Sequence, residues 1–242
     1  MAWFFMNDSI TTEYCTITGE DAAHISRSLR MKPGEPLTLC TPDGRRHECE
    51  ITAVTRDEVT VRILESTVCE QEPGVRVSLY IALMKGDKTD DVVQKAVELG
   101  AYEIIPFISA RCISRPDEKS LSKKLARWQK IADNAASQSR RGIVPQVRPC
   151  IDIRDIPKHT ADTDRAIVFY ECGGDRLRDI VPEKCGSIAL ITGAEGGFEQ
   201  EEIDALREGG IAVATLGRRI LRAQTAPIAA LCAVMLLTGN LE

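Results

Sequence analysis

The first third of the chain alternates apolar and polar positions over short segments. Turn signals such as Thr41-Pro42-Asp43-Gly44 separate segments that are rich in β-branched and aromatic residues. The segments expected to form strands are Trp3–Phe5, Pro36–Cys40, His47–Val54 and Val59–Leu64. One stretch, about Glu20 to Arg30, is typical of a helix instead. The pattern predicts a small β-barrel with one helix over residues 1–72.

Beyond a polar stretch that contains Pro73 and Gly74, buried strands alternate with amphipathic helices. The expected strands are Val77–Leu83, Glu103–Ile108, Ala166–Tyr170, Ile188–Thr192 and Ala212–Leu216. The expected helices are Asp87–Leu99, Glu118–Ser139, Gln200–Glu208 and Thr225–Leu237. This alternation is typical of a parallel sheet covered by helices. We therefore expect an α/β domain over residues 73–242.

The composition is that of an ordinary globular protein. Of the 242 residues, 43% are hydrophobic and 28% are charged, which excludes a disordered, collagen-like or coiled-coil chain. The longest apolar run, Ile228 to Leu237, is shorter than the roughly 18 residues that a membrane span needs. No basic start followed by an apolar stretch marks a signal peptide. We expect a cytoplasmic protein with no membrane partner.

The spacing of cysteine and histidine gives no metal motif. The nine cysteines include no C-x-x-C pair, the closest two being Cys40 and Cys49, and the three histidines stand apart. Zinc sites need closely spaced ligands, and disulfide frameworks need paired cysteines. We expect reduced thiols and no bound metal.

Charge is distributed unevenly along the chain. Residues 1–72 hold seven basic and thirteen acidic side chains, whereas the segment Arg111–Arg148 holds ten basic and three acidic ones, a local charge of +7. Such a segment can form a phosphate-binding face. A solvated helix surface has the same composition, and from charge alone it is the commoner case.

Two glycine turns follow predicted strands of the second domain. IALITGAEGG (188–197) leads from a strand towards an acidic helix start, and TLGRRILRAQTA (215–226) leads from the next strand into the last helix. Glycines let backbone amides approach a ligand, and α/β folds bind ligands at the carboxyl ends of their strands. The first turn has neither the spacing of a dinucleotide fingerprint nor that of a P-loop. A tight connection without a ligand is the alternative for the first turn.

Basic side chains gather at two of these strand ends. Arg218, Arg219 and Arg222 lie in an otherwise apolar setting, where an arginine is usually paired with an anion. A salt-bridged helix start is the alternative for them. Lys85 and Lys88 follow the strand Val77–Leu83, next to a natural helix N-cap at Asp87.

These three stretches, in this order, resemble motifs of the RsmE family, which belongs to the SPOUT superfamily of methyltransferases and methylates N3 of a uridine in small-subunit (16S) ribosomal RNA. The motifs are KGDKTDDVVQKAVELGA, ITGAEGGFEQEE and LGRRILRAQTA. ISARCISR, RWQKIADNAASQSRRGIVPQV and HISRSLRMKPGEPL resemble further segments of that family. The resemblance covers nearly the whole chain.

The resemblance implies a C-terminal SPOUT domain with a trefoil knot, preceded by a PUA-like β-barrel that binds RNA. It implies a homodimer whose active site lies at the subunit contact, with S-adenosylmethionine bound in the knot. The residues that would hold this cofactor are Gly193, Gly197, Leu216, Gly217, Ile220 and Leu221.

Methylation at N3 requires the uracil to lose a proton, so a cation beside the base would stabilise the developing anion. We assign this catalytic role to Arg222. The side chains assigned to RNA phosphates are Lys85, Lys88, Arg111, Arg140 and Arg141, with Arg27 and Arg30 of the barrel. With the resemblance in view, the phosphate-binding interpretation of the basic segment is favoured.

The chain departs from the family pattern at two positions. Gln224 stands where the family usually has Glu, and a neutral amide cannot act as a general base. We therefore assign no general base. Ala194 stands where Pro is common, which loosens one loop.

Two alternatives remain open. One is an RNA-binding protein of the same fold with weakened catalysis, which Gln224 favours and the intact glycine turns disfavour. The other is a SPOUT methyltransferase that acts on another RNA, such as a transfer RNA ribose, which the PUA-like front disfavours. A nucleotide-dependent oxidoreductase lacks its fingerprint here.

Overall fold

The computed structural model describes residues 2–182 and 184–241, and its chain forms two compact units. The first unit comprises residues 1–72 together with 136–144, and the second comprises 73–135 together with 145–242. The segment 136–144 thus packs with a part of the chain that lies more than sixty residues away in sequence.

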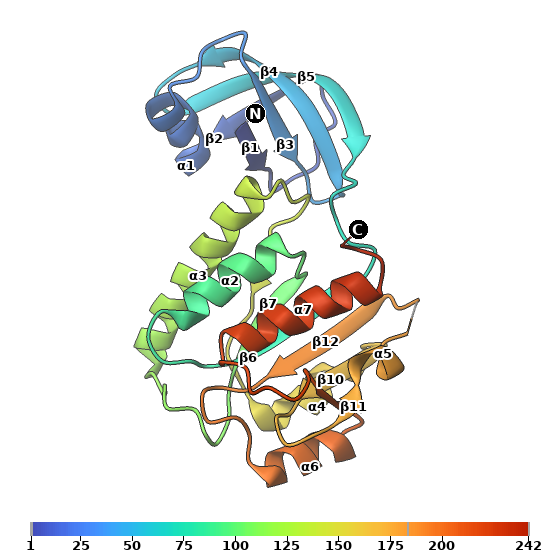
Figure 1. The fold of residues 1–242 in the computed structure, drawn as a ribbon. Helices are drawn as coiled ribbons and strands as arrows, with labels where there is room; N and C mark the ends of the chain where they lie inside the picture. Colours follow the sequence, from blue (N-terminus) through green and yellow to red (C-terminus); the bar gives the residue numbers. More distant parts are fainter. Residues whose placement is uncertain (1, 183, 242) are drawn as a thin grey trace. The chain divides into compact units, whose positions relative to one another are not determined.

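The first unit is built on a curled five-stranded sheet (Figure 1). In spatial order its strands are β1 (Ala2–Phe5), β3 (Pro36–Cys40), β4 (Arg45–Val54), β5 (Glu58–Val68) and β2 (Tyr14–Thr18). β1 pairs with β3 in parallel, and the other pairs are antiparallel. The four predicted strands are confirmed. β2 was not predicted, because in this edge strand only Ile17 is buried and the alternation is weak.

The expected helix of the first unit is two short pieces. A turn of α-helix, α1 (Gly19–Ala23), runs into a π-helical turn, η1 (His24–Leu29), which ends at Arg30 with φ +54°. Ala22 and Ile25 of these turns pack into the core of the curled sheet with Leu37, Leu39 and Ile51. A non-glycine residue at positive φ stops a helix, so the chain reverses there.

The second unit contains a parallel sheet of eight strands. Seven of them follow the order β11 (Asp175–Arg176), β13 (Ala212–Thr215), β10 (Arg165–Phe169), β12 (Ser187–Thr192), β6 (Arg76–Ala82), β7 (Glu103–Ile108) and β8 (Gln146–Val147), and β9 (Ile151–Asp152) also pairs with β7. The predicted parallel α/β sheet is confirmed. The short strands β8, β9 and β11 were not predicted, because two residues carry no periodicity.

Helices connect and cover these strands. They are α2 (Lys88–Glu98), α3 (Glu118–Gln138), α4 (Ile156–His159), α5 (Leu177–Ile180), α6 (Gln200–Glu208) and α7 (Thr225–Leu237), with a 3₁₀ turn, η2 (Ile153–Asp155). α7 packs on β12 and β6 beside α2, as Figure 1 shows. Its buried residues include Leu231, Val234 and Met235. Within the described residues, no helix is long and apolar enough to cross a membrane.

The sheet order decides where a site can form. β10 lies between β12 and β13, so the loops that leave these three parallel strands emerge at one edge of the sheet. The two glycine turns predicted from sequence are the loops after β12 and β13. The topology therefore brings them together around the end of β10.

Candidate active site

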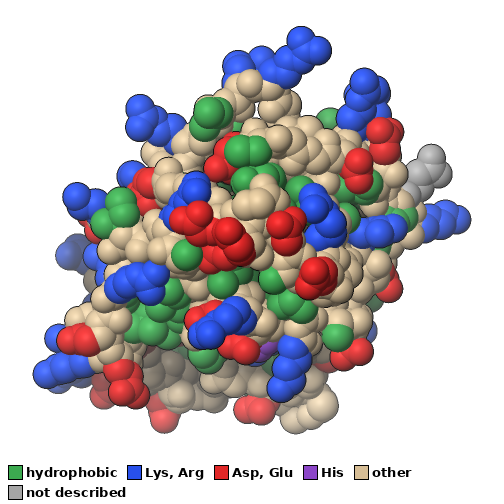
Figure 2. Space-filling model, turned by 90° about the horizontal axis from the view of Figure 1, so that it is seen from below, with side chains coloured by type: hydrophobic (Ala, Val, Ile, Leu, Met, Phe, Trp, Pro, Cys, Tyr) green, Lys and Arg blue, Asp and Glu red, His purple; other side chains and the backbone are tan. Residues whose placement is uncertain are grey.

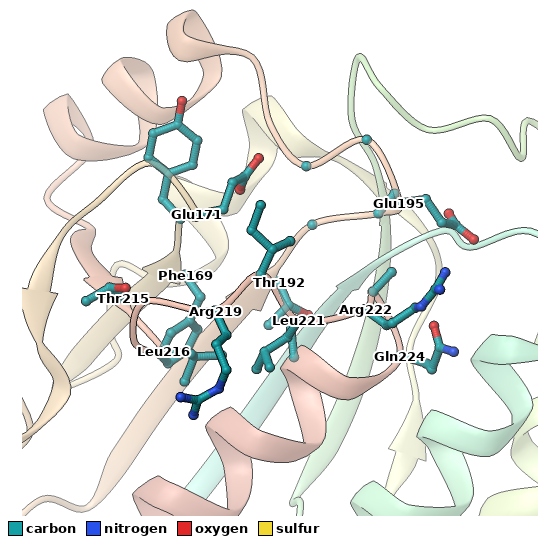
Figure 3. A pocket seen from close by; sticks show the side chains of 18 of the residues that line it. Phe169, Glu171, Thr192, Glu195, Thr215, Leu216, Arg219, Leu221, Arg222 and Gln224 are labelled. Carbon is teal, nitrogen blue, oxygen red and sulfur yellow. The ribbon is translucent and has the colours of Figure 1, made fainter.

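A cavity of about 600 Å³ opens at this edge of the second unit (Figure 3). Its walls come from the ends of β10, β12 and β13, from the start of α7 and from Lys88 at the start of α2. The residues that line it are Lys88, Phe169 to Glu171, Thr192 to Gly197, Thr215 to Gln224, and Ala226. All six residues that the sequence assigned to a cofactor lie in these walls: Gly193, Gly197, Leu216, Gly217, Ile220 and Leu221.

The first glycine turn (residues 193–197) is fixed by its neighbours. Arg111, in the loop after β7, donates to the Gly196 carbonyl at 3.0 Å and forms an ion pair with Glu199 at 2.9 Å. Glu199 is also the N-cap of α6, where its carboxylate and that of Glu202 form a capping box. These contacts hold the C-terminal end of the turn against the loop after β7.

Glu195 ties the same turn to the segment after β6. Its Oε1 accepts from the Lys88 Nζ at 2.5 Å and from the Lys85 backbone N–H at 3.2 Å. Partial burial raises the pKa of the Glu195 carboxyl, but the hydrogen bonds from Lys88 and the backbone outweigh it and lower that pKa overall. Glu195 is therefore ionised at neutral pH and its charge is paired.

Two glycines of the first turn have no room for a side chain. A Cβ at Gly193 would lie 3.0 Å from the ring of Phe198, and a Cβ at Gly197 would lie 2.1 Å from the Glu171 Oε1. Gly197 also has φ +66°, which favours glycine by itself. The glycines thus let the turn pack closely on the end of β10.

The second glycine turn (residues 216–224) is held less tightly. Gly217 has φ +101°, and its N–H donates to the Thr215 Oγ1 at 3.2 Å. Arg218, Arg219 and Arg222 are exposed, and none of their side chains has a hydrogen bond or ion pair with another described residue. Ile220 is 84% exposed although it lies in the cavity wall. An apolar side chain and free cations at the same cavity indicate a ligand surface.

Gln224 closes this turn at the start of α7. Its Oε1 is buried and has no hydrogen-bond partner within the described residues. Figure 3 shows Gln224 beside Arg222, below Glu195 in that view. A buried amide oxygen without a donor costs free energy, so a donor from a ligand would be favoured here.

The other residues assigned to RNA have different surroundings. Lys85, Arg30 and Arg140 are exposed. Arg27 is also exposed and forms an ion pair with Asp57 at 3.3 Å. Arg140 has φ +57°, which directs the chain sharply after α3. Lys88 and Arg111 are exposed enough to meet a ligand, but each already has a carboxylate partner.

Arg141 does not have the environment of a phosphate contact. Only 4% of its side chain is exposed, and its Nε and terminal nitrogen donate to both oxygens of Glu72 at 2.8 and 2.7 Å. Its carbonyl accepts from the indole N–H of Trp3 at 2.9 Å. The bidentate, buried guanidinium joins segment 136–144 to residues 1–72, and this pairing disfavours the predicted contact of Arg141 with RNA.

The structure adds cavity residues that the sequence interpretation missed. Tyr170 and Glu171 follow β10 and line the cavity, and the hydroxyl of Tyr170 donates to the Gln200 Oε1 at 3.3 Å. The available signal was the glutamate followed by Gly173 and Gly174 after a predicted strand. Among the described residues, no group of three or more His, Cys, Asp or Glu could hold a metal ion.

Comparisons with known proteins agree with this arrangement. A family model described as an RNA methyltransferase domain matches residues 70–235, and one described as an RNA methyltransferase PUA domain matches residues 17–64. The ribosomal RNA small subunit methyltransferase E of Bacillus subtilis is 36% identical over 226 residues, covering 90% of this chain and 88% of the relative. That of Mycobacterium bovis is 30% identical over 99% of this chain and 94% of the relative.

A solved structure is similar over its whole length. The crystal structure of a ribosomal RNA small subunit methyltransferase E from Neisseria gonorrhoeae, bound to S-adenosyl methionine, has a TM-score of 0.88 and 32% identity, covering 98% of each chain. The first unit is thus a PUA-like domain, and the second is an RNA methyltransferase domain. The chain belongs to the ribosomal RNA small subunit methyltransferase E (RsmE) family.

Proposed function

We propose that this protein methylates N3 of a uridine in the 16S RNA of the small ribosomal subunit, with S-adenosylmethionine as methyl donor. The observation that carries the proposal is Arg222, an unpaired guanidinium in the wall of a cavity made by two glycine turns. The names of the B. subtilis and N. gonorrhoeae relatives, and the cofactor bound to the latter, support the same reaction class.

The cavity fits this cofactor. Its volume of about 600 Å³ lies in the range of roughly 300–1,000 Å³ that is typical of small-molecule sites. Leu216, Ile220 and Leu221 offer apolar contacts. A Cβ at Gly217 would meet nothing within 4 Å, so the backbone there is open to an approaching ligand, and Gly193 and Gly197 also line the cavity. S-adenosylmethionine supplies a methyl group that is already activated on a sulfonium. The protein therefore has to bind the donor, orient the uracil and favour its anion.

Arg222 performs the last of these tasks. Uracil N3 carries a proton and becomes a good nucleophile when that proton leaves. A guanidinium is charged at every accessible pH, so Arg222 stabilises the anion as it forms. Gln224 cannot take the proton, but its buried Oε1 can accept a hydrogen bond and orient a ligand group. No general base is assigned among the residues of the cavity.

RNA phosphates are bound by cations that have no partner among the described residues. Lys85, Arg30 and Arg140 are of this kind, and Arg27 shares its charge only with an exposed carboxylate. On the face seen in Figure 2, basic and acidic side chains are interspersed. We expect individual cations, rather than one broad positive field, to position the RNA. Lys88 and Arg111 would have to exchange a carboxylate for a phosphate to contribute.

The proposal includes the wider properties of the family resemblance. The second domain would carry the trefoil knot, with the boundary near residue 72, and the protein would act in the cytoplasm without a metal. It would be a homodimer through α7, whose Leu236 and Leu237 are 53% and 40% exposed. Light scattering of the full chain and of Leu236→Asp tests this contact. A monomeric wild type, or a dimer that Leu236→Asp leaves intact, would contradict it.

The function is tested by mass spectrometry of ribosomal RNA nucleosides. A strain that lacks the protein should lose 3-methyluridine from 16S RNA, and the wild-type gene, but not the Arg222→Ala variant, should restore it. Methylation assays of free 16S RNA, assembled small subunits and transfer RNA then identify the substrate. If the strain that lacks the protein keeps its 3-methyluridine and the protein still binds RNA, the RNA-binding alternative is favoured. If the protein methylates transfer RNA, a methyltransferase with another RNA substrate is favoured.

A further inference from the structure

Glu171 lies at the edge of the sheet where the glycine turns emerge. It lies two residues beyond β10, which pairs with β12 so that Phe169 stands opposite Thr192. Gly193, the first residue of the glycine turn, directly follows Thr192. An acidic side chain therefore stands at the end of the strand next to the one that carries the glycine turn.

The carboxylate of Glu171 is directed at that turn. A Cβ on Gly197 would lie 2.1 Å from its Oε1 and 2.9 Å from its Cδ, so the carboxylate fills the space that a side chain at position 197 would need. Figure 3 shows Glu171 beside the first turn and well separated from Arg222. The side chain belongs to the cavity wall, at a distance from the group proposed to act on the uracil.

The carboxylate of Glu171 is exposed, so water solvates it when no ligand is bound. It has no hydrogen bond or ion pair with a described residue, although Arg111 is near enough to interact with its charge. The guanidinium of Arg111 instead donates to Glu199 and to the Gly196 carbonyl. The hydroxyl of Tyr170 points to Gln200. An ionised carboxylate is an acceptor only, with two oxygens that can bind two donors.

We propose that Glu171 binds the ribose of the nucleoside cofactor, with its carboxylate accepting hydrogen bonds from the 2′- and 3′-hydroxyls. A vicinal diol offers two neighbouring donors, which matches a carboxylate whose oxygens are both free. In other open α/β sheets an acidic residue on a neighbouring strand serves the ribose in the same way. The methyl group has to lie near Arg222, so the ribose falls on the other side of the donor. This inference rests on the proposed function.

The experiment compares two ligands that differ only in the diol. Equilibrium dialysis with labelled S-adenosylmethionine gives its affinity, and competition gives the affinities of adenosine and 2′,3′-dideoxyadenosine. The wild type should bind adenosine about tenfold or more tightly than the dideoxy compound. Glu171→Ala should bind the two equally and should bind S-adenosylmethionine at least about tenfold more weakly. Glu171→Gln, which keeps one acceptor, should fall between them.

Glu208→Ala, which removes an exposed carboxylate at the end of α6, is the matched control and should behave as the wild type. A wild type that binds both nucleosides equally, or a preference for adenosine that survives in Glu171→Ala, would overturn the role of Glu171. Failure of the wild type to bind S-adenosylmethionine would instead refute the proposed function. Circular dichroism checks that each variant is folded. If Glu171→Ala does not fold, the affinities of Glu171→Gln decide the test instead.

Discussion

The two glycine turns of the cavity use their charged neighbours in opposite ways. Around the first turn, the cations Lys88 and Arg111 are paired with Glu195 and Glu199, and these pairs fix the loop. Around the second turn, three arginines have no partner among the described residues, and Ile220 stands 84% exposed. The loops follow β12 and β13, the two strands on either side of β10, and both line the same cavity.

The paired and unpaired cations of the two turns have different roles in the site. Ion pairs that are satisfied within the protein hold the first loop in place before a ligand arrives, which lowers the cost of ordering it. Unpaired cations in the second loop are available to a ligand, and they cost little free energy because water solvates them. A basic residue therefore indicates RNA or substrate only where its charge is not already paired.

The largest effect is expected where a paired cation is also buried. Arg141→Ala removes the partner of Glu72 at a site with 4% exposure, so the free energy of unfolding should fall by about 3 kcal/mol or more. Chemical denaturation measures this loss. Arg140→Ala, at the exposed neighbouring position, is the control and should change stability by less than about 0.5 kcal/mol. A stable Arg141→Ala variant that only loses RNA binding would support the predicted phosphate contact instead.

The second-largest effect is expected at Arg222, on the unpaired side of the comparison. If Arg222 stabilises the uracil anion, Arg222→Ala should lower turnover by about a hundredfold or more, roughly 3 kcal/mol, because this interaction exists mainly in the transition state. RNA affinity should change little. Single-turnover methylation and filter binding measure the two quantities separately.

Raising the pH should partly rescue Arg222→Ala, because more of the uracil is then deprotonated without help. Arg207→Ala, an exposed arginine of α6 outside the cavity wall, is the control and should leave single-turnover rates near those of the wild type. If Arg222→Ala loses RNA binding and keeps its turnover, then Arg222 is a phosphate contact.

Periodicity predicted most of the fold. The main strands and helices were identified because each has a run of buried positions with a clear period, as in β12 and α2. β2 was missed because it is an edge strand with one buried residue. The expected helix over 20–30 was not one regular helix, since its second half is a π-helical turn that ends at Arg30.

The parts of the candidate site that depend on local sequence were predicted. Glycine turns after strands are visible in sequence, and the six cofactor residues do line one cavity. Which charges form ion pairs depends on the tertiary structure. Lys88 and Glu195 are 107 residues apart in sequence, and Arg141 and Glu72 are 69 apart. The sequence gives each charge but not its partner, so paired and unpaired cations could not be distinguished.

A smaller effect is expected at Arg111, which pins the first turn from the loop after β7. Arg111→Ala should reduce affinity for S-adenosylmethionine by several-fold, about 1 kcal/mol, because the turn loses preorganisation. Calorimetry measures this change. Arg207→Ala removes a comparable exposed pair with Asp204 on α6, away from the cavity, and should leave affinity unchanged. Unchanged cofactor affinity with a weaker salt dependence of RNA binding would make Arg111 a phosphate contact instead.

The smallest effect is expected at Arg140, the exposed neighbour of the buried Arg141. A single phosphate contact releases about one counterion, so Arg140→Ala should lower the slope of log affinity against log salt concentration by roughly 0.7 to 0.9. Turnover at saturating RNA should stay near that of the wild type, because the contact is equal in the ground and transition states. The slope is measured by filter binding at several salt concentrations, with Arg207→Ala as the paired control. An unchanged slope for Arg140→Ala would show that exposure and an unpaired charge are not sufficient to mark a phosphate contact in this protein.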